Sequence, residues 1–237
     1  MIRNLLISGI TAGVIAGALL SLIQQYNVVP LILEAEIYEV KTNQHSHTSE
    51  NQELKPDQNK QHEWTPEDGS ERTLFTLMTN ILLGIGFSLL LISLMTAAKH
   101  SGWQSGLLWG LAGFSVFYLA PSLGLPPELP GSVQATLEHR QLWWIITVIS
   151  TAIGLSLLLL NPAVTFKILG VLFILTPHFF TGTVSIEAVG PVPKELEYSF
   201  IIATSFANIL FWTVLGTVNG IFRSHYLESG SMQKAMS

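Results

Sequence analysis

The sequence predicts an all-α, polytopic transmembrane helical bundle of five to six spans with one long polar outer loop. Charged residues make up only 11% of the 237 positions, whereas 49% are hydrophobic. Four stretches contain no Asp, Glu, Lys or Arg, and each can cross ~30 Å of hydrocarbon, which takes roughly 20 helical residues. These stretches are residues 5–33, 73–98, 107–125 and 142–161.

The first stretch is predicted to be a membrane span and not a signal peptide. After Arg3 the apolar run continues through Val29, beyond the ~7–15-residue core of a secretory signal. Two further apolar segments follow, one at 163–186, which Pro177 and His178 interrupt, and one at 200–222. The interrupted segment decides between five and six spans. We expect residues 1–237 to form a single transmembrane domain, with the polar outer loop at 40–72.

The charges divide unequally between the two sides of this bundle. If all six segments cross, fifteen of the sixteen acidic residues lie opposite the N-terminus, together with six basic residues. The short loops on the N-terminal side are basic, which places the N-terminus in the cytoplasm. An anionic outer face raises the local concentration of cations. The alternative is that the acidic loop is simply a solvated surface.

Glycines recur at four-residue spacing in three of the spans. Such ridges of small residues let helix backbones approach closely in lipid. The alternative is that they line a pore. The ridges are Gly9, Gly13 and Gly17, then Gly102, Gly106 and Gly110, and finally Gly216 and Gly220. For the few polar side chains within the spans, Gln24, Gln25, Asn80, Tyr118 and Asn208, hydrogen bonding between helices is the expected role.

The outer loop contains residues that can bind a metal ion without sulfur. His45 and His47 form an H-x-H pair, and His62 follows with several acidic residues between them; the chain has no cysteine. Imidazole and carboxylate ligands suit cobalt, nickel or zinc. A short H-S-H in a polar loop can equally be solvated. Glu34 and Glu36 follow the first apolar stretch directly, at the base of this loop.

Two further candidate ligands lie beside prolines. Glu128 stands in the segment 124–131, where three prolines exclude a regular helix and stiffen the backbone. His178 follows Pro177, which removes a backbone donor within an apolar segment. A rigid surface turn and a satisfied polar group are the respective alternatives. We expect the 124–131 segment and the base of the outer loop to lie at the same membrane face.

The sequence lacks the motifs of the common enzyme classes. No G-x-x-x-x-G-K-[ST] phosphate loop, no complete H-E-x-x-H and no G-x-S-x-G occurs. We therefore predict that the chain is not an enzyme, and we expect no nucleic-acid partner.

Six short runs carry a recognisable family pattern: residues 31–39, 64–73, 120–131, 140–144, 151–155 and 177–178. Together they resemble the CbtA family, the predicted cobalt transporter subunits. The resemblance extends over nearly the whole chain in order. It implies a bacterial inner-membrane, multi-pass protein of five spans, linked to cobalt supply for cobalamin synthesis, and a small single-span partner of CbtB type that carries a His motif. Cobalt would be the transported substrate, with no tightly bound cofactor.

Two hypotheses follow. In the first, the chain is a subunit of a divalent-cation transporter: His45, His47 and His62 capture the ion, and Glu34, Glu36, Glu128 and His178 pass it toward the bundle. In the second, it is a non-transporting membrane scaffold or assembly partner. Convergence of His178, Glu34 and Glu128 on one polar cavity would favour transport, whereas a solidly apolar bundle would favour the scaffold.

Overall fold

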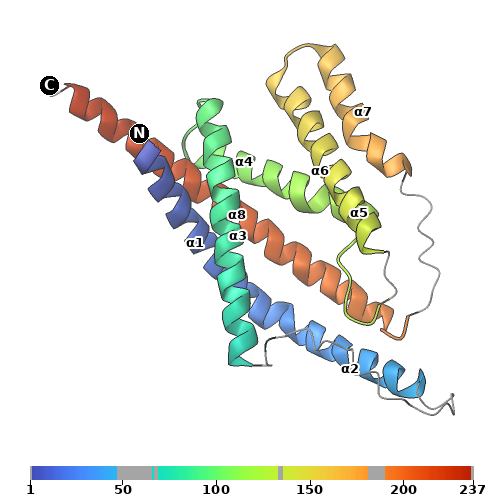
Figure 1. Ribbon diagram of the computed structural model, residues 1–237. Coiled ribbons are helices and arrows are strands. Elements are labelled where there is room, and N and C mark those ends of the chain that lie inside the picture. The colour runs from blue at the N-terminus through green and yellow to red at the C-terminus, as the bar shows by residue number, and fades with distance from the viewer. Residues whose placement is uncertain (1, 47–65, 67–68, 133–135, 181–189, 236–237) are drawn as a thin grey trace.

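The computed structural model describes residues 2–46, 66, 69–132, 136–180 and 190–235, and the regular structure in these ranges is helical (Figure 1). For residues 2, 39–46, 180 and 227–235 it describes the backbone only. The elements are α1 (Ile2–Asn27), α2 (Val29–Ser46), α3 (Ser70–Ala97), α4 (Trp103–Phe114), the π-helical η1 (Ser115–Leu119), α5 (Ala120–Gly124), α6 (Leu137–Leu160), α7 (Val164–Phe180) and α8 (Lys194–Ala235).

Within the described ranges, five helical segments are long and apolar enough to cross a membrane: Arg3–Asn27, Ser70–Ala97, Trp103–Gly124, Leu137–Leu160 and Lys194–Tyr226. The helix α7, with 17 residues, is about 25 Å long at 1.5 Å per residue and so falls short of ~30 Å. The prediction of an all-α bundle with five to six spans is confirmed. The interrupted apolar segment is the short helix.

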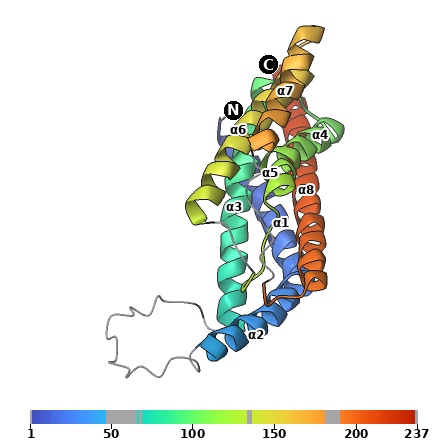
Figure 2. The ribbon, with the colours of Figure 1, turned by 90° about the vertical axis from the view of Figure 1, so that its right-hand side faces the viewer.

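The first apolar stretch is not one helix, and the prediction was wrong about where it ends. The helix α1 stops at Asn27, and α2 begins at Val29 and leads away across the end of the bundle (Figure 2). Pro30 explains the break because it has no N–H to continue the α1 hydrogen bonds. Its ring fits the start of α2, where Ile32 N donates to Val28 O at 3.2 Å. The predicted loop 40–72 is helical over 40–46 and 70–72.

The helices α1, α3 and α8 form the main bundle, and glycines set the distance between α1 and α3. A Cβ on Gly17 would come within 2.7 Å of Ile81 Cα, and a Cβ on Gly84 would overlap the backbone of Gly13. The predicted close packing through glycine ridges is therefore confirmed here. In lipid, where the hydrophobic effect does not pull helices together, such close backbone contact helps to hold them in place.

Close packing at glycines also joins α4 to α8 and α6 to α7. A Cβ on Gly106 would meet the backbone of Gly216 and Gly220, and the Gly102 N–H donates to Gly220 O at 3.0 Å. Gly154 and Gly170 face one another in the same way between α6 and α7.

Of the five polar side chains predicted to bond between helices, four do so: Gln24, Gln25, Asn80 and Tyr118. Asn80 Nδ2 donates to Gln24 Oε1 at 2.6 Å, and the Tyr118 hydroxyl lies 2.9 Å from Ser205 Oγ. Asn208 differs, because its amide donates to Thr204 O within its own helix. A fully buried pair that the sequence did not single out joins α3 to α8: Asn219 Nδ2 donates to Ser88 Oγ at 2.8 Å.

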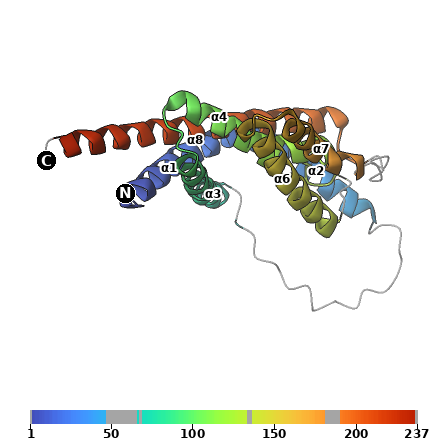
Figure 3. The ribbon, with the colours of Figure 1, turned by 90° about the horizontal axis from the view of Figure 1, so that it is seen from above.

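The hairpin of α6 and α7 stands apart from α1 and α3 (Figure 3). It is attached mainly through α5 and η1. The helix α6 ends at Leu160, which lines a pocket together with His100 and Trp109. The helix α7 returns antiparallel to α6, and His178 near its end packs on Trp143 near the start of α6.

Candidate functional site

One end of the bundle gathers the predicted carboxylates. Leu129 of the proline segment is fully buried in a cluster with Val28 and Ala35 of the α1–α2 junction and with Leu196 of α8. The 124–131 segment and the base of the outer loop therefore lie at the same end of the bundle, which agrees with the prediction that they share a face. We call this the acidic end, defined by Glu34, Glu36, Glu128 and Glu197.

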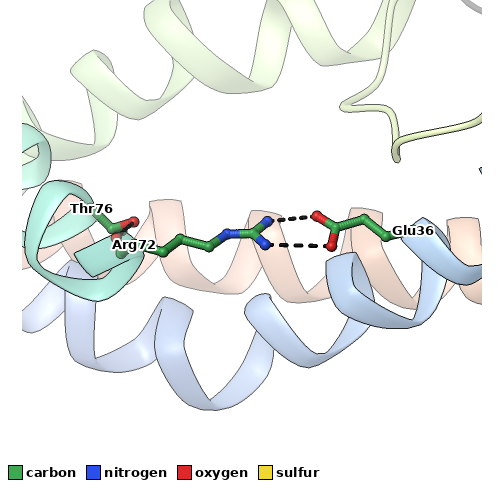
Figure 4. Close-up of polar contacts among 3 residues, drawn as sticks. All are labelled: Glu36, Arg72 and Thr76. Carbon is green, nitrogen blue, oxygen red and sulfur yellow. Dashed lines mark hydrogen bonds and ion pairs between the residues drawn. The ribbon is translucent and has the colours of Figure 1, made fainter. Parts of the chain in front are cut away.

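Glu36 is tied to the start of α3 by an ion pair (Figure 4). Arg72 Nη2 donates to Glu36 Oε1 at 2.7 Å and Nη1 to Oε2 at 3.4 Å. The two side chains remain 29% and 34% exposed. The Arg72 carbonyl accepts the Thr76 hydroxyl at 2.9 Å. This two-point contact joins α2 to the start of α3.

Glu128 is the least exposed carboxylate of the predicted set. Its Oε2 lies 2.6 Å from Arg140 Nη1 of α6, and its side chain is only 14% exposed against 33% for Arg140. A turn follows Glu128, in which the Ser132 hydroxyl donates to Leu129 O at 2.6 Å. Burial raises the pKa of Glu128, Arg140 opposes that rise, and Glu197 adds to it.

The tryptophans after Arg140 fix α6 against α5 and η1. Trp143 Nε1 donates to Pro121 O at 3.1 Å, and Trp144 Nε1 donates to Phe117 O at 3.3 Å. The Phe117 carbonyl is open to this bond because Pro121, four residues later, has no N–H. The two bonds attach the Arg-Gln-x-Trp-Trp run of α6 to the helical turns that precede the proline segment.

His178 lies beside the same part of α6. Its ring packs edge-on against Trp143 with centroids 5.5 Å apart, and Pro177 before it is buried. Since Arg140 and Trp143 are three residues apart on one helix, Glu128 and His178 both contact the first turns of α6.

The other predicted ligands do not share this contact with α6. Glu34 is exposed on α2, and Glu36 is on α2 as well. His45 belongs to the last turn of α2, where only the backbone is described, and His47 and His62 lie outside the described residues. In the described ranges no group of three or more His, Asp or Glu could hold a metal ion. The convergence of His178, Glu34 and Glu128 that would favour transport is absent from this part of the chain.

The sequence prediction missed the two arginines that hold the carboxylates. Arg72 immediately precedes the apolar stretch 73–98, and Arg140 precedes 142–161. Each is a basic residue at the start of a span on the side richest in acid. That position is the signal that could have found them.

One of three comparisons with known proteins gives a match. No curated protein and no solved structure matches the chain. The family model described as "Probable cobalt transporter subunit (CbtA)" matches residues 2–224. This multi-pass membrane protein therefore belongs to the CbtA family, the probable cobalt transporter subunits.

Proposed function

We propose that the chain is a non-enzymatic subunit of a divalent-cation uptake system in a bacterial inner membrane, with cobalt as its cargo. Cobalamin synthesis would use the metal, and a small single-span partner of CbtB type would complete the transporter. The family match over residues 2–224 carries this proposal. Cobalt is here a transported substrate and not a resident cofactor.

The acidic end suits the first contact with a cation. Glu128 is held by one arginine, and Glu197 lies close enough to raise its pKa. A divalent cation that binds Glu128 would take the place of Arg140 and relieve the repulsion between the two carboxylates. Because burial raises the pKa of Glu128, protons compete with the cation at a higher pH than they would at an ordinary carboxyl.

The ligand set requires contributions from beyond the described residues. Cobalt takes nitrogen and oxygen ligands, and the described part of the chain offers Glu128 and His178 beside α6 but no group of three. We propose that His45, His47 and His62 capture the ion, with Glu34 and Glu36 at the base of their segment. The partner would supply the remaining ligands.

The scaffold hypothesis is retained as the second candidate. It is favoured by the glycine ridges, which pack against helix backbones, and by the lack of a three-ligand group in the described ranges. On this hypothesis the arginine–carboxylate pairs serve only to hold α2 and the proline segment in place.

Cobalt accumulation in cells separates the two candidates. Cells of low background would express the chain with its partner, each alone, or the pair carrying Glu128→Gln. We expect saturable accumulation by the pair and loss of most of it in Glu128→Gln. Glu138→Gln is the matched control, because Glu138 lies exposed in the first turn of α6. Accumulation that is unchanged by Glu128→Gln would contradict the proposed role of Glu128, and accumulation by the partner alone would favour the scaffold.

A further inference from the structure

Two hydroxyl groups on α6 are buried without a hydrogen-bond partner among the described residues. Thr147 and Thr151 are 0% and 2% exposed, and the Oγ1 atom of each is unpaired. Leaving a buried hydroxyl unpaired is unfavourable, so native proteins nearly always supply a partner, often an ordered water.

These threonines differ from many other hydroxyl residues of the helices. In those residues the side chain donates to the carbonyl four positions earlier in its own helix, as Thr11 of α1 does to Ile7 O at 2.8 Å and Thr176 of α7 to Leu172 O at 2.6 Å. That bond is the default in an apolar helix. Thr147 and Thr151 do not make it, so their hydroxyls are available to another partner.

The two hydroxyls lie on the face of α6 that meets α7. The buried residues of α6 are Trp143, Thr147, Thr151 and Gly154, which at spacings of three and four share one face. Trp143 packs on His178, and Gly154 packs on Gly170 and Ile174. In an antiparallel pair, Thr147 and Thr151 therefore lie between these two contacts, opposite the part of α7 that precedes His178.

A proline lies within α7 opposite these hydroxyls, and the helix continues through it to Phe180. Pro177 has no N–H, so the carbonyl of Phe173 cannot receive the usual bond from the residue four positions later. At membrane depth a backbone group without its helical bond needs a partner from protein or from water. Threonine hydroxyls, a proline-altered carbonyl and the His178 imidazole supply oxygen and nitrogen groups along an otherwise apolar contact.

We propose that this α6–α7 seam, made of Thr147, Thr151, Phe173 O and His178, is hydrated and forms the cation's path from the acidic end into the membrane. The entrance lies at the first turn of α6, where Arg140 holds Glu128. The inference rests on the proposed function for the identity of the cargo. The hydration of the seam is measurable without transport.

The chain contains no cysteine, so single cysteines report directly on water access. Thr147→Cys and Thr151→Cys would be treated with a charged, water-soluble thiol reagent in the assembled complex, with and without cobalt. We expect both to be modified, and cobalt to slow the reaction. Ala16→Cys is the dry control, since Ala16 is 0% exposed in the apolar core; Glu138→Cys is the exposed control.

A second pair of variants keeps the test informative if a cysteine variant folds poorly. Thr147→Val and Thr151→Val preserve shape and remove only the hydroxyl. We expect each to lower cobalt accumulation roughly fivefold, the equivalent of one net hydrogen bond, while Thr176→Val leaves it unchanged. Normal uptake by both valine variants would overturn the proposal.

The cysteine results separate failure of the seam from failure of the proposed function. Suppose that the parent complex accumulates cobalt, but the cysteines at 147 and 151 react no faster than the cysteine at 16. That result would overturn the hydrated seam and leave the proposed function intact. Modification that cobalt does not slow would also overturn the path. Modification slowed by cobalt supports the seam, and a parent that still fails to accumulate cobalt would count against the proposed function alone.

Discussion

Removing Arg140 is predicted to cost more stability than removing Arg72, although both arginines pair with a carboxylate at the acidic end. The partner of Arg140, Glu128, is 14% exposed, whereas the partner of Arg72, Glu36, is 34% exposed. Exposed pairs contribute about 0–1 kcal/mol, and loss of one member of a buried pair costs about 3–5 kcal/mol. Since Arg140 itself is 33% exposed, we expect Arg140→Gln to lower the free energy of unfolding by about 1–3 kcal/mol. The expectation for Arg72→Gln is below about 1 kcal/mol.

The penalty of Arg140→Gln should depend on pH, with a definite sign. Burial already raises the pKa of Glu128, and loss of Arg140 removes the influence that opposes this rise. A folded-state pKa above the ordinary carboxyl value means that the folded state binds the proton more tightly than the unfolded state. Stability therefore falls as the pH rises from the ordinary carboxyl value through the raised pKa. Below that window Glu128 is neutral in both states, and the variant should approach the parent.

Reversible unfolding in mixed micelles, followed by circular dichroism during an SDS titration, measures both effects. The double variant Glu128→Gln with Arg140→Gln should recover part of the loss, because no uncompensated charge is left buried. Equal costs for Arg140→Gln and Arg72→Gln, or a cost for Arg140→Gln that does not change with pH, would refute the reasoning from burial.

Two further predictions concern packing and the candidate ligands. Gly84→Ala should destabilise the protein by about 1–3 kcal/mol, the typical cost of overpacking, because its Cβ would overlap the Gly13 backbone; Gly86→Ala is the control, since nothing lies within 4 Å of the position of its Cβ. Unfolding titrations in micelles measure both, and equal costs would contradict close packing at Gly84. His178→Ala should strongly lower cobalt accumulation without affecting membrane insertion, whereas the double change His45→Ala with His47→Ala should mainly raise the cobalt concentration needed. Cobalt uptake would be measured against cobalt concentration at matched amounts of each variant. Normal uptake by His178→Ala would show that His178 is an ordinary polar residue outside the path of the ion.

Much of the bundle could be predicted because lipid imposes strict rules on sequence. Long uncharged stretches have few stable alternatives to helices in a membrane, and glycine ridges indicate close helix contacts, as Gly17 and Gly84 confirm. Pro30 is also a sequence signal for the break between α1 and α2. The prediction missed this break because residues 5–33 are apolar without interruption.

The candidate site was less predictable because its contacts are not local. The Arg72–Glu36 pair joins residues 36 positions apart on two helices, and the angle of α2, which no periodicity specifies, brings them together. Residue type alone could not distinguish Thr147 and Thr151 from the threonines that bond to their own helix. That difference depends on side-chain orientation at one helix contact.

The most direct test of cobalt transport uses purified components. The chain and its small partner would be reconstituted into vesicles that contain a cobalt-quenched fluorophore, and cobalt would be added outside. The proposed function predicts saturable quenching that requires both proteins and is lost with Glu128→Gln but kept with Glu138→Gln. Quenching no faster than in protein-free vesicles, with both proteins present and folded in the membrane, would contradict it.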